Sequence, residues 1–168
     1  YGSLMWRPGF AFAERRMARL SDFRRRFCLR SIRHRGTPET PGLVLGLDAE
    51  AGAACDGVAY RVGPEDPAGV LAYLRARELV TYAYHEQHHP LLLDDGRRVE
   101  ALCYVVDRAH PQYAGGLAPE EQAAIILRAS GLGGPNLDYV RSTVAHLHEL
   151  GVPDPELDAL AALVERAG

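Results

Sequence analysis

The chain has 168 residues, of which 47% are hydrophobic and 24% are charged, a mix that predicts a globular protein. Its net charge of −3 argues against a nucleic-acid partner, because nucleic-acid-binding domains usually carry a basic surface. No apolar run approaches the roughly 20 residues that a membrane helix needs, so we predict no membrane partner. The length fits one domain over residues 1–168. Since residue 1 is not Met, we expect some N-terminal residues to be missing.

The first strand patterns lie between residues 20 and 62. Residues 20–32 mix arginine with apolar side chains and predict a strand with one face in water. Residues 43–47 are continuously apolar, which is typical of a buried strand. Residues 55–62 predict a third strand, which Gly63 and Pro64 end.

A helix follows, and one of its residues breaks the pattern. Asp66 suits the N-cap and Pro67 suits the first helical position. Apolar residues such as Leu71 and Leu74 share one side of this helix, and at about 100° per residue Glu78 falls on the same side. Glu78 therefore either ends the helix in solvent or is kept on the apolar side for chemistry. The spacing leaves both alternatives open.

The rest of the chain predicts a hairpin and then helices. Residues 81–93 and 99–106 flank a turn at residues 94–96, which favours a β-hairpin. Asn136 suits the N-cap of the second of three closing helices. These helices are expected over residues 119–130, over residues 136–150 and from residue 154 onward. Strands followed by helices indicate an α+β fold, in which helices pack outside a curved sheet or barrel.

Several polar and reactive side chains have ordinary explanations. Three histidines beside Glu86 could suggest a metal site, but neighbours on a strand point apart and no zinc-binding spacing exists, so we predict no metal. Ser3 lacks the sequence context of a nucleophile. On pattern alone, Arg25 lies on a solvated face and Tyr139 packs with its hydroxyl in solvent. The three histidines are His85, His88 and His89.

The three cysteines are scattered along the chain and form no CxxC pair. An odd, scattered set predicts buried, reduced thiols that serve packing. We therefore expect a reducing compartment and a cytoplasmic protein. The residues are Cys28, Cys55 and Cys103.

An ordered set of short blocks resembles the ChaC-like γ-glutamylcyclotransferase family, and its bacterial branch in particular. The blocks include YGSLMW at residues 1–6, FCLR at 27–30, GVAYR at 57–61, Arg77-Glu78, LDDG at 93–96, His110-Pro111 with Tyr113, and Asn136 with Tyr139. The resemblance covers nearly the whole chain. It implies a small mixed β-barrel flanked by α-helices. It also implies an enzyme that converts glutathione to 5-oxoproline and cysteinylglycine without a cofactor.

The same resemblance implies the site residues. The family's catalytic glutamate corresponds to Glu78. The segment after it, LVTYAY, lacks two glycines that some members have, so either Tyr82 or Tyr84 could face the substrate. The substrate-binding residues that the resemblance implies are Tyr1, Gly2, Ser3, Leu4, Met5, Arg25, Tyr82 and Tyr139.

Elementary chemistry explains why these residue types suit the reaction. Burial raises the pKa of a glutamate, which makes it a better proton acceptor from an ammonium group. Backbone N–H groups in a Gly-Ser turn can bind a carboxylate or an oxyanion. We expect Gly2 to be required for an unusual φ or for close approach of the ligand. Two other functions remain open: a cyclotransferase for other γ-glutamyl compounds, and a non-catalytic γ-glutamyl-binding module.

Overall fold

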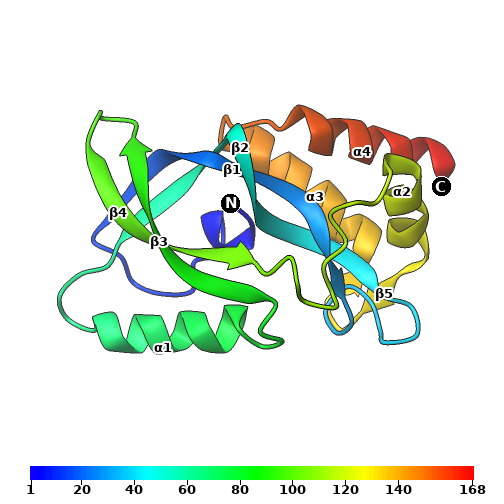
Figure 1. The fold of residues 1–168 in the computed structure, drawn as a ribbon, viewed down its shortest axis with the longest axis horizontal. Helices are drawn as coiled ribbons and strands as arrows, with labels where there is room; N and C mark the ends of the chain where they lie inside the picture. The colour runs from blue at the N-terminus through cyan, green and yellow to red at the C-terminus, as the bar shows by residue number, and fades with distance from the viewer. The chain divides into compact units, whose positions relative to one another are not determined.

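The computed structural model describes all residues from 1 to 168, and they form two compact units (Figure 1). The first unit contains residues 1–25 and 47–107, and the second contains residues 26–46 and 108–168. Two long strands, β1 (Glu14–Ser31) and β2 (Gly42–Arg61), contribute residues to both units. The single domain expected from the length stays a prediction. None of the helices combines the length and the apolar character that crossing a membrane requires.

The first unit is built on a mixed sheet. Its strands pair in the closed order β1-β2-β4-β3, where β3 is Tyr84–Leu93 and β4 is Arg98–Val106. The β2–β4 pair is parallel, whereas β3 is antiparallel to both of its neighbours. This arrangement confirms the α+β fold with a mixed sheet. One apolar core cluster contains Ala18, Leu20, Phe23, Leu47, Cys55, Leu91, Leu93 and Val105.

Two expected strands, residues 43–47 and 55–62, are one continuous strand in the structure, β2. Residues 48–54, for which the sequence predicted no strand, also belong to β2. Each of the two long strands contains one left-handed residue: Gly52 of β2 has a φ of +80° and Asp22 of β1 has a φ of +63°. The Gly52 N–H donates to Asp22 Oδ1 at 2.8 Å. β1 also begins earlier than expected, at Glu14.

The helix of the first unit, α1 (Pro67–Glu78), begins where the sequence predicts. Asp66 caps it, since its carboxylate accepts the Gly69 N–H at 2.8 Å. The expected β3–β4 hairpin is also confirmed, and Gly96 in its turn has a φ of +86°. In Figure 1 the β3–β4 hairpin is green, and α1 lies between β2 and β3 along the chain.

The second unit contains three helices that pack against one another (Figure 1). The expected N-cap role of Asn136 is wrong: Pro135 holds that position. The Asn136 side chain is fully buried and bonds both the N–H and the C=O of Leu43, at 2.6 and 2.8 Å. The elements of this unit are α2 (Pro119–Arg128), β5 (Ser130–Gly131), β6 (Gly134–Pro135), α3 (Asn136–Glu149) and α4 (Pro155–Ala167).

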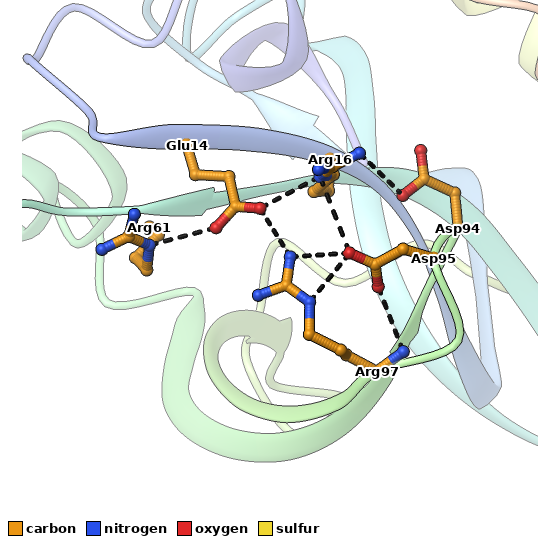
Figure 2. Close-up of polar contacts among 6 residues, drawn as sticks. All are labelled: Glu14, Arg16, Arg61, Asp94, Asp95 and Arg97. Carbon is orange, nitrogen blue, oxygen red and sulfur yellow. Dashed lines mark hydrogen bonds and ion pairs between the residues drawn. The ribbon is translucent and has the colours of Figure 1, made fainter.

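A charged network joins three chain segments at the surface of the first unit (Figure 2). Glu14, at the start of β1, accepts hydrogen bonds from Arg16, from Arg61 at the end of β2, and from Arg97 beside the hairpin turn. Arg97 also bonds Asp95. Hydrogen bonds from the three arginines lower the pKa of Glu14 to about 2.

This shift predicts how acid affects the first unit. The folded pKa of Glu14 is about 2 and its ordinary value is 4.5. Its contribution to stability is therefore present above the ordinary value and lost as the pH falls toward the lower one. We expect Glu14→Gln to melt at a lower temperature than the wild type at pH 7, by a small margin because the network is exposed.

Thermal melts followed by circular dichroism at a series of pH values test this expectation. The difference in melting temperature should shrink as the pH falls from 4.5 toward 2. Glu100→Gln is the matched control, since Glu100 is an exposed glutamate of β4 that bonds no arginine. A difference that stays constant down to the lowest pH would contradict the assignment.

Candidate active site

The segment YGSLMW folds into a short 3₁₀ turn, η1 (Ser3–Met5), that opens the first unit. The Met5 N–H donates to the Gly2 carbonyl at 2.9 Å. The N–H groups that begin such a turn, those of Ser3 and Leu4, have no acceptor within it and can bind an anion. Gly2 has a φ of −127°, which other residues also adopt. The expected need for an unusual φ is therefore wrong, and close approach of a ligand is the remaining reason for glycine.

Two side chains from the sheet hold the carbonyl groups of this loop. Arg25 is only 4% exposed, and its guanidinium donates to the carbonyl oxygens of Tyr1, at 3.1 Å, and of Asp56. The solvated-face interpretation of Arg25 is therefore wrong. The Tyr60 hydroxyl donates to the Met5 carbonyl at 2.8 Å. Within the loop, these bonds involve only carbonyl oxygens and do not use the N–H groups of Ser3 and Leu4.

Glu78 is the last residue of α1, and its side chain is 16% exposed. The half-buried side of the helix also carries Leu71 and Leu74, as the spacing predicted. Burial raises the pKa of Glu78, and the positive charge of Arg77 opposes this rise. A helix C-terminus also disfavours a carboxylate. The alternative of a helix end in solvent is therefore wrong, and Glu78 is a largely buried acid with a raised pKa.

The loop and Glu78 lie close together. Arg77 contacts both of them: its Nη2 donates to the Ser3 hydroxyl at 2.9 Å, and its Nε lies 3.2 Å from Glu78 Oε1. The Glu78 carboxylate also interacts electrostatically with Tyr104 on β4. Tyr104 is 4% exposed and its hydroxyl donates to Glu86 at 3.0 Å. Burial, together with this bond, raises the pKa of the Tyr104 phenol. Neither Tyr60 nor Tyr104 stood out in the sequence, because a tyrosine in an apolar strand is an ordinary core residue.

The Ser3 hydroxyl accepts a hydrogen bond from Arg77 Nη2 at 2.9 Å. A guanidinium cannot take a proton from a serine, so this contact gives Ser3 no general base. The geometry therefore agrees with a binding role for the loop and gives no support to a serine nucleophile.

The tyrosines of the sequence prediction lie in different settings. Tyr82 follows Glu78 in a turn with a φ of +55° and is 76% exposed, whereas Tyr84 begins β3 and is partly buried. Tyr139 belongs to α3 in the second unit, where it contacts Phe27 edge to face and Arg35 lies over its ring at 5.2 Å. The roles of Tyr82 and Tyr139 in binding stay predictions.

Two of the three histidines of β3 have a local partner. His85 lies 3.5 Å from Asp107, and His89 bonds Gln87 and contacts the Phe23 ring. No group of three acidic, histidine or cysteine side chains is arranged to hold a metal ion.

All three cysteines are free thiols. Cys28 and Cys55 are buried, which confirms the packing prediction for both. Cys103 is partly buried and packs against the core cluster of the first unit. Burial raises the pKa of the Cys103 thiol, which keeps it protonated near neutral pH.

Comparisons with known proteins agree with this geometry. The chain is 38% identical over 166 residues to a glutathione-specific gamma-glutamylcyclotransferase of Escherichia coli (strain K12), and the match covers 99% of this chain and 71% of that relative. It is 34% identical over 170 residues to glutathione-specific gamma-glutamylcyclotransferase 1 of Homo sapiens, covering 100% and 76%.

The fold has a close counterpart among solved structures. A crystal structure of a gamma-glutamylcyclotransferase specific to glutathione, from yeast, superposes with a TM-score of 0.86 at 23% identity. The superposition covers 99% of this chain and 96% of the yeast chain. The family model described as "ChaC-like protein" matches residues 1–167. Together with the sequence relatives, this match shows that the chain belongs to the ChaC-like protein family.

Proposed function

We propose that this protein is a glutathione-specific γ-glutamylcyclotransferase, which converts glutathione to 5-oxoproline and cysteinylglycine. The observation that carries the proposal is the largely buried Glu78, whose carboxylate has a raised pKa and contacts Arg77, which in turn bonds Ser3 of η1. The E. coli and human relatives bear the name of this activity. A buried acid with a perturbed pKa beside a ligand-binding loop is typical of an active site.

The reaction is a cyclisation within the γ-glutamyl group. Its α-amine attacks its own γ-carbonyl carbon, a C–N bond closes the five-membered lactam, and the amide bond to cysteine breaks. The α-amine is protonated near neutral pH, since its ordinary pKa is roughly 7.7–8.0. Glu78 accepts a proton from this amine and returns it to the leaving amine of cysteinylglycine. Burial makes this exchange feasible, because it brings the pKa of the acid toward that of the amine.

The loop supplies orientation. An extended γ-glutamyl group must fold so that its amine meets its own carbonyl, and holding the folded conformer lowers the entropic part of the barrier. The N–H groups that begin η1 bind the α-carboxylate of the substrate or the oxyanion that forms on the γ-carbonyl. Arg25 and Tyr60 keep the loop in position through its carbonyls. The reaction needs no metal and no organic cofactor, and the buried thiols suit the cytoplasm.

A product assay tests the proposal. Purified protein is incubated separately with glutathione and with γ-glutamylalanine in the presence of a chelator, and 5-oxoproline and the released amine are quantified. We expect 5-oxoproline and cysteinylglycine in equal amounts from glutathione, and much less 5-oxoproline from γ-glutamylalanine. Faster turnover of γ-glutamylalanine would indicate a cyclotransferase for other γ-glutamyl compounds. Binding of glutathione without any product would indicate a binding module.

A further inference from the structure

One side chain, Arg77, bonds the substrate-binding loop at several points. Its Nη2 donates to the Ser3 hydroxyl at 2.9 Å. Its Nη1 donates to the carbonyl oxygens of Arg7 at 2.7 Å and of Pro8 at 3.3 Å. These contacts span some seventy positions of the sequence and fasten the first residue of η1, and the segment that follows η1, to the last turn of α1.

The same guanidinium contacts the proposed general base. Arg77 Nε lies 3.2 Å from Glu78 Oε1, and the Arg77 side chain is only 24% exposed. Its Nη1 also donates to the Tyr73 hydroxyl at 3.0 Å. Tyr73 in turn lies against Gly9, where an added Cβ would be 2.1 Å from the tyrosine oxygen. The guanidinium is therefore held between the helix and the loop.

We infer that Arg77 is the positioning residue of the site, which fixes the distance between the Glu78 carboxylate and the η1 loop. This inference rests on the proposed function. An arginine suits the task because its donors lie in a rigid plane and can bond a carboxylate and a hydroxyl on different edges. A lysine retains the positive charge but has one nitrogen, so it cannot bond Glu78 and the loop in the same way.

Arg77 contributes two things, a positive charge beside Glu78 and a planar set of donors to the loop. The effect of the charge on the pKa of Glu78 allows the two to be separated. Arg77 contacts the Glu78 carboxylate, and the Tyr104 phenol interacts with that carboxylate electrostatically. Arg77 lowers the pKa of Glu78, against the effect of burial. Removing the charge should therefore raise the pKa of Glu78 further, whereas removing only the planar geometry should not.

Two variants of the full chain separate these effects. For Arg77→Met we expect kcat with glutathione to fall by roughly 10²-fold, the scale of loss that a displacement of about 1 Å causes. We also expect KM to rise. In a plot of kcat against pH, we expect the acidic limb to move to higher pH. For Arg77→Lys we expect KM to rise while the acidic limb stays close to that of the wild type. Arg75→Met is the matched control, because Arg75 lies on the same helix and bonds Glu86 but no residue of the loop.

A direct titration of Glu78 distinguishes this inference from the proposed function. The carboxyl carbon of Glu78 is followed by NMR over a pH series, with Glu78→Gln used to assign its signal. We expect Arg77→Met to raise the pKa of Glu78 and Arg75→Met to leave it unchanged, whether or not the protein turns over glutathione. An unchanged Glu78 pKa and wild-type KM values in both Arg77 variants would overturn the inference. An inactive wild type with the expected titration would overturn only the proposed function.

Discussion

Replacing Glu78 with glutamine should lower the turnover of glutathione by roughly 10²–10⁴-fold, the range expected for the loss of one general acid–base group. Glutamine keeps the shape of the side chain but cannot accept a proton from the substrate amine. The measurement is the rate of 5-oxoproline formation at saturating glutathione, with circular dichroism to verify the fold. Near-wild-type turnover in Glu78→Gln would remove Glu78 from the mechanism.

The same variant should be more stable than the wild type at neutral pH. Burial raises the pKa of Glu78 above its ordinary value of 4.5. Folding therefore favours the protonated acid, and stability is lost as the pH rises through the raised pKa. Glutamine carries no charge and avoids this loss. We expect the melting temperature of Glu78→Gln to exceed that of the wild type at pH 7 and to approach it below pH 4.5. A variant that is both inactive and less stable at neutral pH would indicate a structural role for the carboxylate.

Replacing Asn136 with alanine should cause a large loss of stability in the second unit. The Asn136 side chain is fully buried and bonds both backbone groups of Leu43. Alanine would leave a buried N–H and a buried C=O unpaired, at a cost of about 1–3 kcal/mol for each group. The expected decrease in the free energy of unfolding is therefore about 2–6 kcal/mol, a large part of the roughly 5–15 kcal/mol that holds a typical domain together.

Urea unfolding followed by circular dichroism measures this loss. Thr143→Val is the control from the same helix, because Thr143 is also fully buried but its hydroxyl oxygen has no hydrogen-bond partner. We expect this variant to be as stable as the wild type or more so, since valine keeps the shape and removes an unpaired polar group. Equal losses in Asn136→Ala and Thr143→Val would show that packing, and not the two hydrogen bonds to Leu43, determines the effect.

Local sequence signals predicted much of this fold. Asp66 and Pro67 marked the start of α1, and the turn before Arg98 marked the β3–β4 hairpin, because caps and tight turns depend on a few adjacent residues. The joined strand β2 was missed for a different reason. Its middle part contacts a distant segment, as in the bond from the Gly52 N–H to Asp22 of β1, and a pairing of distant residues leaves no local pattern.

The candidate site shows the same division between local and distant signals. Helical spacing placed Glu78 on the apolar side of α1, but only the fold could decide between a solvent-exposed end and a largely buried acid. Arg25 looked like part of a solvated arginine run, yet the fold buries it against the carbonyls of Tyr1 and Asp56. The supporting role of Tyr60 was also invisible, since its partner lies more than fifty positions away.

The bonds from Arg25, Tyr60 and Arg77 to the loop have a consequence for how substrate selectivity is encoded. A backbone N–H group is chemically the same whichever side chain its residue carries. The proposed binding surface of η1 therefore depends little on the residue types within η1 itself. The shape of the loop does depend on side chains, and three of the side chains that hold it are those of Arg25, Tyr60 and Arg77. Under the proposed binding role of η1, substrate specificity therefore depends on residues that need not touch the substrate.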